Sequence, residues 1–65
     1  MGSPEDGSGE IYFEFTPIGR SVKVSAIDAA TGLEVSVVGP ASASQADLTR
    51  LALQKLKSRL AAERP

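Results

Sequence analysis

Residues 26–40, AIDAATGLEVSVVGP, contain the end of one predicted strand, a turn, a second strand and its termination. Apolar residues occupy every second position from Leu33 to Val37, which is the period of a half-buried strand. Facing residues of an antiparallel pair share one face of the sheet. Ala26 and Val35 are both expected to face inward, and one has an even and the other an odd number, so the loop between their strands must contain an even number of residues. Pairing Asp28 with Leu33 leaves the loop 29–32. This pairing predicts a hairpin in which Ala26 faces Val35.

The residues of this loop suit a turn. Gly32 supplies the left-handed residue that ends a four-residue hairpin loop. Asp28 lies just before the turn, where its carboxylate can accept hydrogen bonds from the backbone amides that follow. Asp28, Thr31 and Gly32 are therefore interpreted as turn residues.

Two more alternating segments precede this hairpin, EIYFEFTP at 10–17 and SVKVSAID at 21–28, and both predict half-buried strands. The parity of their apolar residues allows a loop of two or four residues between them. We favour pairing Thr16 with Ser21, which leaves the loop 17–20 and places Glu14 opposite Lys23 on the outer face.

A helix follows the third strand, which Pro40 terminates because proline cannot donate to a strand ladder. Ser44 with Asp47 fits the S-x-x-D start signal, and Ser42 with Gln45 fits nearly as well, so the predicted start varies by two residues. The helix is expected to fray near Glu63. Its apolar face carries Leu48, Ala52, Leu53, Leu56 and Leu60.

These elements predict an α+β fold, a three-stranded antiparallel meander with one C-terminal helix packed on one face, in the order β-β-β-α. Residues 10–62 form the single domain, residues 1–9 a disordered tail, and residues 63–65 a frayed C-terminus. The sheet is expected to contribute to the core Ile11, Phe13, Phe15, Val22, Val24, Ala26, Leu33, Val35 and Val37.

The composition excludes several kinds of chemistry. The 65 residues include no cysteine and no histidine, which removes thiol catalysis, zinc–thiolate sites and a Ser-His-Asp triad. Glu14, Asp28 and Glu34 are not expected to converge, and the serines of GPASAS at 39–44 are interpreted as helix-capping residues. We therefore expect no enzyme, no cofactor and no metal. Without a signal segment or a membrane-spanning apolar run, a cytoplasmic location is the simplest interpretation.

The charges are unevenly distributed. Residues 1–46 hold six acidic and two basic residues, a net charge of −4, whereas residues 47–65 have a net charge of +3. Four cations flank the apolar face of the helix and are candidate phosphate contacts: Arg50, Lys55, Lys57 and Arg59. Weak nucleic-acid binding through this helix is the alternative function, and the acidic sheet and the lack of interleaved aromatic residues argue against it.

The third strand is predicted to be an open sheet edge. In a meander the first and third strands are both edges, and Glu10, Glu14 and Pro17 protect the first one. The third strand carries a single charge. It is therefore the candidate protein-binding edge, formed by Leu33, Glu34, Val35, Ser36, Val37 and Val38.

The assembled pattern resembles a family of short, uncharacterised proteins from alphaproteobacteria. The shared elements are an I-D-x-x-T-G-x-E-V hairpin, a V-G-P stop and a helix with a K-L pair. Here they correspond to Ile27, Asp28, Thr31, Gly32, Glu34, Val35, Val38, Gly39, Pro40, Lys55 and Leu56. The resemblance covers most of residues 11–60 and implies no functional residue.

The element order also resembles the later part of a double-stranded-RNA-binding domain. That family's first helix is missing, and SQADLTR at 44–50 replaces its lysine-rich motif, so the phosphate contacts are not carried over. The leading expectation is a small non-enzymatic protein-interaction module that binds an unknown protein or itself, with neither a nucleic-acid nor a membrane partner.

Overall fold

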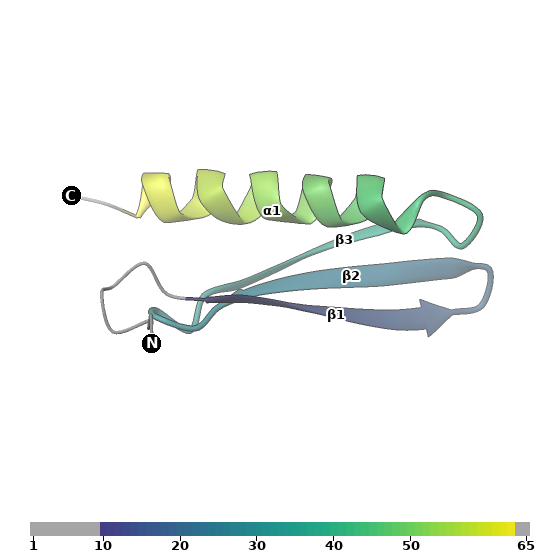
Figure 1. The fold of residues 1–65 in the computed structure, drawn as a ribbon, viewed down its shortest axis with the longest axis horizontal. Helices are drawn as coiled ribbons and strands as arrows, with labels where there is room; N and C mark the ends of the chain where they lie inside the picture. The colour runs from purple at the N-terminus through teal and green to yellow at the C-terminus, as the bar shows by residue number, and fades with distance from the viewer. Residues whose placement is uncertain (1–9, 64–65) are drawn as a thin grey trace.

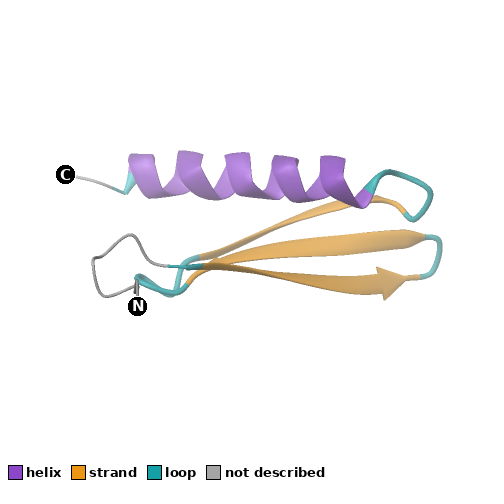
Figure 2. Ribbon diagram, in the orientation of Figure 1, coloured by secondary structure: helices purple, strands orange, loops and turns teal. Residues whose placement is uncertain are grey.

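The computed structural model describes residues 10–63; the predicted tail 1–9 and residues 64–65 lie outside the described residues. Three strands precede one helix along the chain: β1 (Ile11–Ile18), β2 (Ser21–Asp28), β3 (Glu34–Pro40) and α1 (Gln45–Ala62). The strands form one antiparallel sheet in the order β1-β2-β3, and α1 lies along one face of it (Figures 1 and 2). The α+β fold with β-β-β-α order is confirmed.

The second hairpin has the predicted register. Ala26 faces Val35, and Asp28 N–H donates to the Leu33 carbonyl at 2.8 Å, which leaves the four-residue loop 29–32. Gly32 has φ of 77°, in the left-handed region that glycine enters without strain.

The Asp28 carboxylate holds this loop in place, as predicted. Its Oδ2 accepts hydrogen bonds from Thr31 N at 3.1 Å and from Thr31 Oγ1 at 2.7 Å. Thr31 Oγ1 in turn accepts from Leu33 N at 3.1 Å. Asp28 is buried at the end of β2, and Thr31 supplies the hydrogen-bond donors that its carboxylate needs there.

Replacing Asp28 with alanine is expected to destabilise the domain by about 1–3 kcal/mol, because the two hydrogen bonds from Thr31 to the charged carboxylate are lost. Chemical denaturation measures the change, with Glu34→Ala as a control at an exposed carboxylate. Equal unfolding midpoints for the two variants would show that the carboxylate does not hold the loop.

The predicted register of the first hairpin was wrong. Ile18 faces Ser21, so the loop is only Gly19–Arg20, and Gly19 has φ of 58°. A positive φ at the first of two loop positions is typical of a type II′ turn, in which glycine is favoured. The prediction instead placed this glycine late in a longer loop.

The shift of the register by two residues changes the cross-strand partners of β1. Glu14 faces Ser25 instead of Lys23, and Lys23 faces Thr16. The expected Glu14–Lys23 pair is therefore not directly opposed in the sheet.

The core lies between α1 and the two strands β2 and β3, with which the helix makes most of its contacts. The buried apolar residues are Val24, Ala26, Val35, Leu48, Ala52 and Leu56. Gly39 allows the first turn of α1 to approach the sheet, because a Cβ there would lie 2.6 Å from Leu48 Cδ2. Phe15 was expected in the core, but it is 41% exposed because the helix covers little of β1.

The first of the two predicted helix starts is correct. Ser44 is the N-cap, and its hydroxyl accepts from Asp47 N at 3.2 Å. Asp47 lies in the first turn and Arg59 in the last, as the helix dipole favours. The amide of Glu63 donates to the Arg59 carbonyl at 3.0 Å and closes the last turn.

Candidate interaction surface at the two sheet edges

The β3 edge has backbone groups that face away from the sheet. Because Asp28 pairs with Leu33 through hydrogen bonds, Leu33, Val35 and Val37 bond to β2. The alternate residues therefore direct their amides and carbonyls outward, and these are Glu34, Ser36 and Val38. Val35 is buried and Val38 is 63% exposed.

Lys55 occupies the centre of this edge. Its Nζ donates to the Ser36 carbonyl at 2.7 Å, across from α1 to β3. The Ser36 hydroxyl is also bound, to Ser25 Oγ at 2.9 Å on the outer face. A partner strand would have to displace the Lys55 ammonium. Charged side chains at a sheet edge, lysine above all, protect edge strands from pairing with other chains.

The β1 edge has a different set of outward groups. Ala29 N–H donates to the Glu10 carbonyl at 2.9 Å, and this bond fixes the alternation along β1. The even-numbered residues bond to β2, so Ile11, Phe13 and Phe15 direct their amides and carbonyls outward. Pro17 offers only a carbonyl at this edge, because it has no amide proton.

The same three residues have apolar side chains on the helix side of the sheet. Phe13 faces Ala26 and Phe15 faces Val24, both of which are core residues. Ile11 and Phe13 are half-buried and Phe15 is 41% exposed, because α1 lies over β2 and β3 (Figure 1). Ile11, Phe13 and Phe15 are called the β1 apolar strip below. The sequence did not indicate this strip, because the helix was expected to cover the whole inner face.

The four candidate phosphate contacts do not form one free basic patch. Arg50 pairs with Asp47, and Arg59 lies 3.6 Å from the Glu63 carboxylate. Lys55 binds the Ser36 carbonyl, and Lys57 is exposed. These pairs are exposed to solvent and contribute little stability, but they place carboxylates beside two of the cations.

The three acidic candidates lie apart along the sheet. Glu14 faces Ser25, Glu34 faces Ile27 as predicted, and Asp28 binds Thr31. Within residues 10–63 no group of three or more potential ligands is arranged to hold a metal ion.

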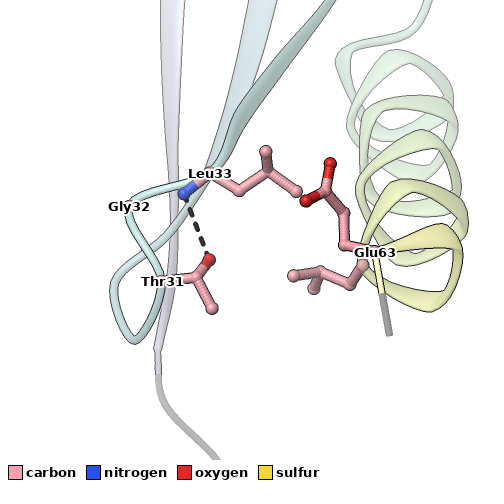
Figure 3. A pocket seen from close by; sticks show the side chains of 5 residues that line it. Thr31, Gly32, Leu33 and Glu63 are labelled. Carbon is pink, nitrogen blue, oxygen red and sulfur yellow. Dashed lines mark hydrogen bonds between the residues drawn. The ribbon is translucent and has the colours of Figure 1, made fainter. Parts of the chain in front are cut away.

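An open pocket of about 290 Å³ lies between the β2–β3 loop and the end of α1. Thr31, Gly32 and Leu33 line one side and Glu63 lines the other (Figure 3). Leu60 of α1 also lines the pocket. The Thr31 hydroxyl is already bonded to Asp28 and to Leu33 N, and Glu63 is the single carboxylate of the lining. The pocket therefore presents no pair of groups suited to acid–base chemistry.

Among residues 10–63, Tyr12 is the one side chain whose pKa is clearly shifted. Its hydroxyl donates to Glu10 Oε1 at 2.6 Å, and this hydrogen bond and the negative charge of Glu10 raise the pKa of Tyr12 above its ordinary value of 10.0. The interaction favours the folded state below pH 10 and is lost as the pH rises through the folded-state pKa.

Replacing Glu10 with glutamine is expected to lower the pKa of Tyr12 towards its ordinary value, because the carboxylate charge is removed. The chain has a single tyrosine, so the absorbance of tyrosinate during an alkaline titration reports on this residue alone. Identical titration midpoints for the parent and the variant would contradict the Tyr12–Glu10 contact.

The described part of the chain is thus a three-stranded sheet with one covering helix and two edges of unequal protection. Its sequence belongs to the family described as Domain of unknown function (DUF6898), whose family model matches residues 8–64. Searches of curated proteins and of solved structures found no match. Among the described residues, no helix has the length and apolar character needed to cross a membrane.

Proposed function

We propose that this domain is a small, non-enzymatic protein-interaction module of the cytoplasm that binds its partner by strand addition at a sheet edge. The observation that carries the proposal is the β1 apolar strip. At its three positions, outward backbone groups and partly exposed apolar side chains lie along one edge. In strand addition, main-chain hydrogen bonds provide affinity and side-chain contacts provide specificity.

The chemistry of the chain supports a binding role over catalysis. Cysteine and histidine are lacking, so a thiol nucleophile and the usual base near neutral pH are missing from the sequence. Asp28, the buried carboxylate, is bonded to Thr31 and acts in the turn.

The two edges are not equally suited to a partner. At β3, binding would have to replace the contact between Lys55 and Ser36, whereas at β1 the charged side chains project on the outer face, away from the apolar strip. Binding at the β3 edge, Leu33 to Val38, remains the prediction from the sequence. The side-chain contacts favour β1.

The experiment compares edge variants in affinity capture from a source-cell lysate. The immobilised parent, Phe15→Lys and Ser36→Lys would be scored by mass spectrometry for bound protein. We expect Phe15→Lys to lose a bound protein that the parent and Ser36→Lys retain, because a lysine at an edge opposes strand pairing. Loss with Ser36→Lys alone would assign binding to β3. Capture that neither variant affects would contradict edge binding, as would no capture by a parent that also stays monomeric in solution.

Nucleic-acid binding is tested separately, by titrating labelled duplex DNA, duplex RNA and single strands at low and at physiological salt. We expect no strong binding, because Arg50 and Arg59 lie beside carboxylates and the sheet is acidic. Submicromolar, salt-sensitive binding to any of these probes would replace the proposed function with the alternative one.

A further inference from the structure

The β1 edge has the chemistry to pair with a copy of itself. Its outward backbone groups come from alternate residues, and an antiparallel strand with the same alternation can satisfy all of them. Pairing about a two-fold axis perpendicular to the sheet places both helices on the same face. It also extends the three strands of each copy into one continuous sheet.

Only a few registers allow the outward groups of the two copies to meet. The outward groups belong to odd-numbered residues, so odd positions of one copy must face odd positions of the other. Three such registers have an obvious cost. Placing Glu14 on the axis sets it against Glu14 of the second copy. Placing Tyr12 on the axis sets Glu10 against Glu14. Like charges in directly opposite positions destabilise a strand pair. Placing Phe15 on the axis sets Phe13 against Pro17, which has no amide proton to donate.

The remaining central register places Phe13 on the two-fold axis. The amide and carbonyl of Phe13 then bond to those of Phe13 in the second copy, and Ile11 bonds to Phe15 on each side. On the outer face, Tyr12 lies opposite Glu14 and Glu10 lies opposite Thr16, so no two acids are directly opposed. Every outward amide and carbonyl of the β1 apolar strip has a partner in this arrangement.

The side chains support the same register. Ile11, Phe13 and Phe15 of the two copies lie side by side on the helix side of the joined sheet, which removes water from apolar surface that α1 leaves uncovered. Residues 1–9, MGSPEDGSG, contain no large apolar residue apart from Met1, so this segment does not match the strip.

We propose that two copies of this chain dimerise through antiparallel pairing of their β1 strands, with Phe13 on the two-fold axis. The proposal rests on the proposed function, since it names a second copy as the partner of the β1 edge.

The oligomeric state decides this proposal. Sedimentation equilibrium from micromolar to millimolar concentration would compare the parent with Phe15→Lys and Val38→Lys. Phe15 lies outside the buried core, so its lysine variant is expected to fold, and circular dichroism checks this. We expect Phe15→Lys to raise the dimer dissociation constant at least about tenfold, the effect of about 1.4 kcal/mol. Val38→Lys, which adds the same charge to β3, should leave it unchanged.

A second variant tests the backbone contacts without changing a side chain. The 65-residue chain can be synthesised chemically with an N-methyl group on the Phe13 amide, which points away from β2 and serves no bond within the sheet. We expect this variant to fold as the parent does and to dimerise at least about tenfold more weakly.

The outcomes separate this proposal from the proposed function. A parent that stays monomeric at millimolar concentration would overturn the dimer, as would a dimer weakened by Val38→Lys but not by Phe15→Lys. If the monomeric parent still captured a protein that Phe15→Lys lost, the proposed function would stand with a different partner. If the parent neither dimerised nor captured a protein that Phe15→Lys lost, both proposals would be rejected.

Discussion

Substitution of Leu56 by alanine is expected to lower the free energy of unfolding by about 2–5 kcal/mol, because the shortened side chain leaves a cavity in a packed core. Leu56 is fully buried, and its helix lies against β2 and β3. A domain of this size has only a few kcal/mol of net stability, so the variant is expected to be partly unfolded at room temperature.

Leu51→Ala is the matched control for this substitution. It makes the same change in the same helix, but Leu51 is 51% exposed, so we expect a change of about 0.5 kcal/mol or less. Urea denaturation followed by circular dichroism measures both variants. Equal midpoints for Leu56→Ala and Leu51→Ala would mean that α1 packs on the sheet through a different face.

Substitution of Ala52 by glutamate is expected to prevent folding, because it places a carboxylate without a partner in the centre of the contact between α1 and the sheet. Ala52 is fully buried and belongs to the same core as Val24 and Leu56. The larger side chain also has no space beside these residues, and overpacking adds to the cost of burying the charge.

Ala46→Glu is the control, because it introduces the same residue at an exposed position in the first turn, where the helix dipole favours an acid. Circular dichroism and thermal unfolding are expected to show a folded Ala46→Glu and an unfolded Ala52→Glu. A cooperative unfolding transition for Ala52→Glu near that of the parent would contradict the described core.

The second hairpin could be predicted because several independent signals agree on it. The parity of Ala26 and Val35 restricts the loop to an even length, Gly32 supplies the positive φ, and Asp28 has a local acceptor role that needs no tertiary contact. The helix start is equally local, since the Ser44 hydroxyl binds an amide three residues later. Local chemistry of this kind can be read from the sequence.

The first hairpin could not be fixed in the same way. Parity allowed a loop of two or four residues, and Pro17 with Gly19 suited a longer turn. The structure has the shorter loop, in which Gly19 takes the first position and Pro17 stays within β1, where its missing amide faces outward. The correct loop length therefore depended on which edge of β1 is unpaired, and this is set by the tertiary structure.

The candidate site depended still more on tertiary structure. The sequence identified two sheet edges but ranked them by their own charges. The lateral position of α1 changes that ranking, because it brings Lys55 to the Ser36 carbonyl and leaves Phe15 partly exposed. No residue pattern within the strands indicates where a helix will lie across them.

Residue-resolved amide hydrogen exchange over a series of protein concentrations tests the central claim, that two copies of this domain pair through their β1 edges. At low concentration we expect fast exchange at Ile11, Phe13 and Phe15, whose amides face outward from the sheet. Their protection is expected to rise with protein concentration as a second copy pairs with β1. Protection that instead appears at the outward amides of β3, or does not change with concentration at either edge, would contradict the account.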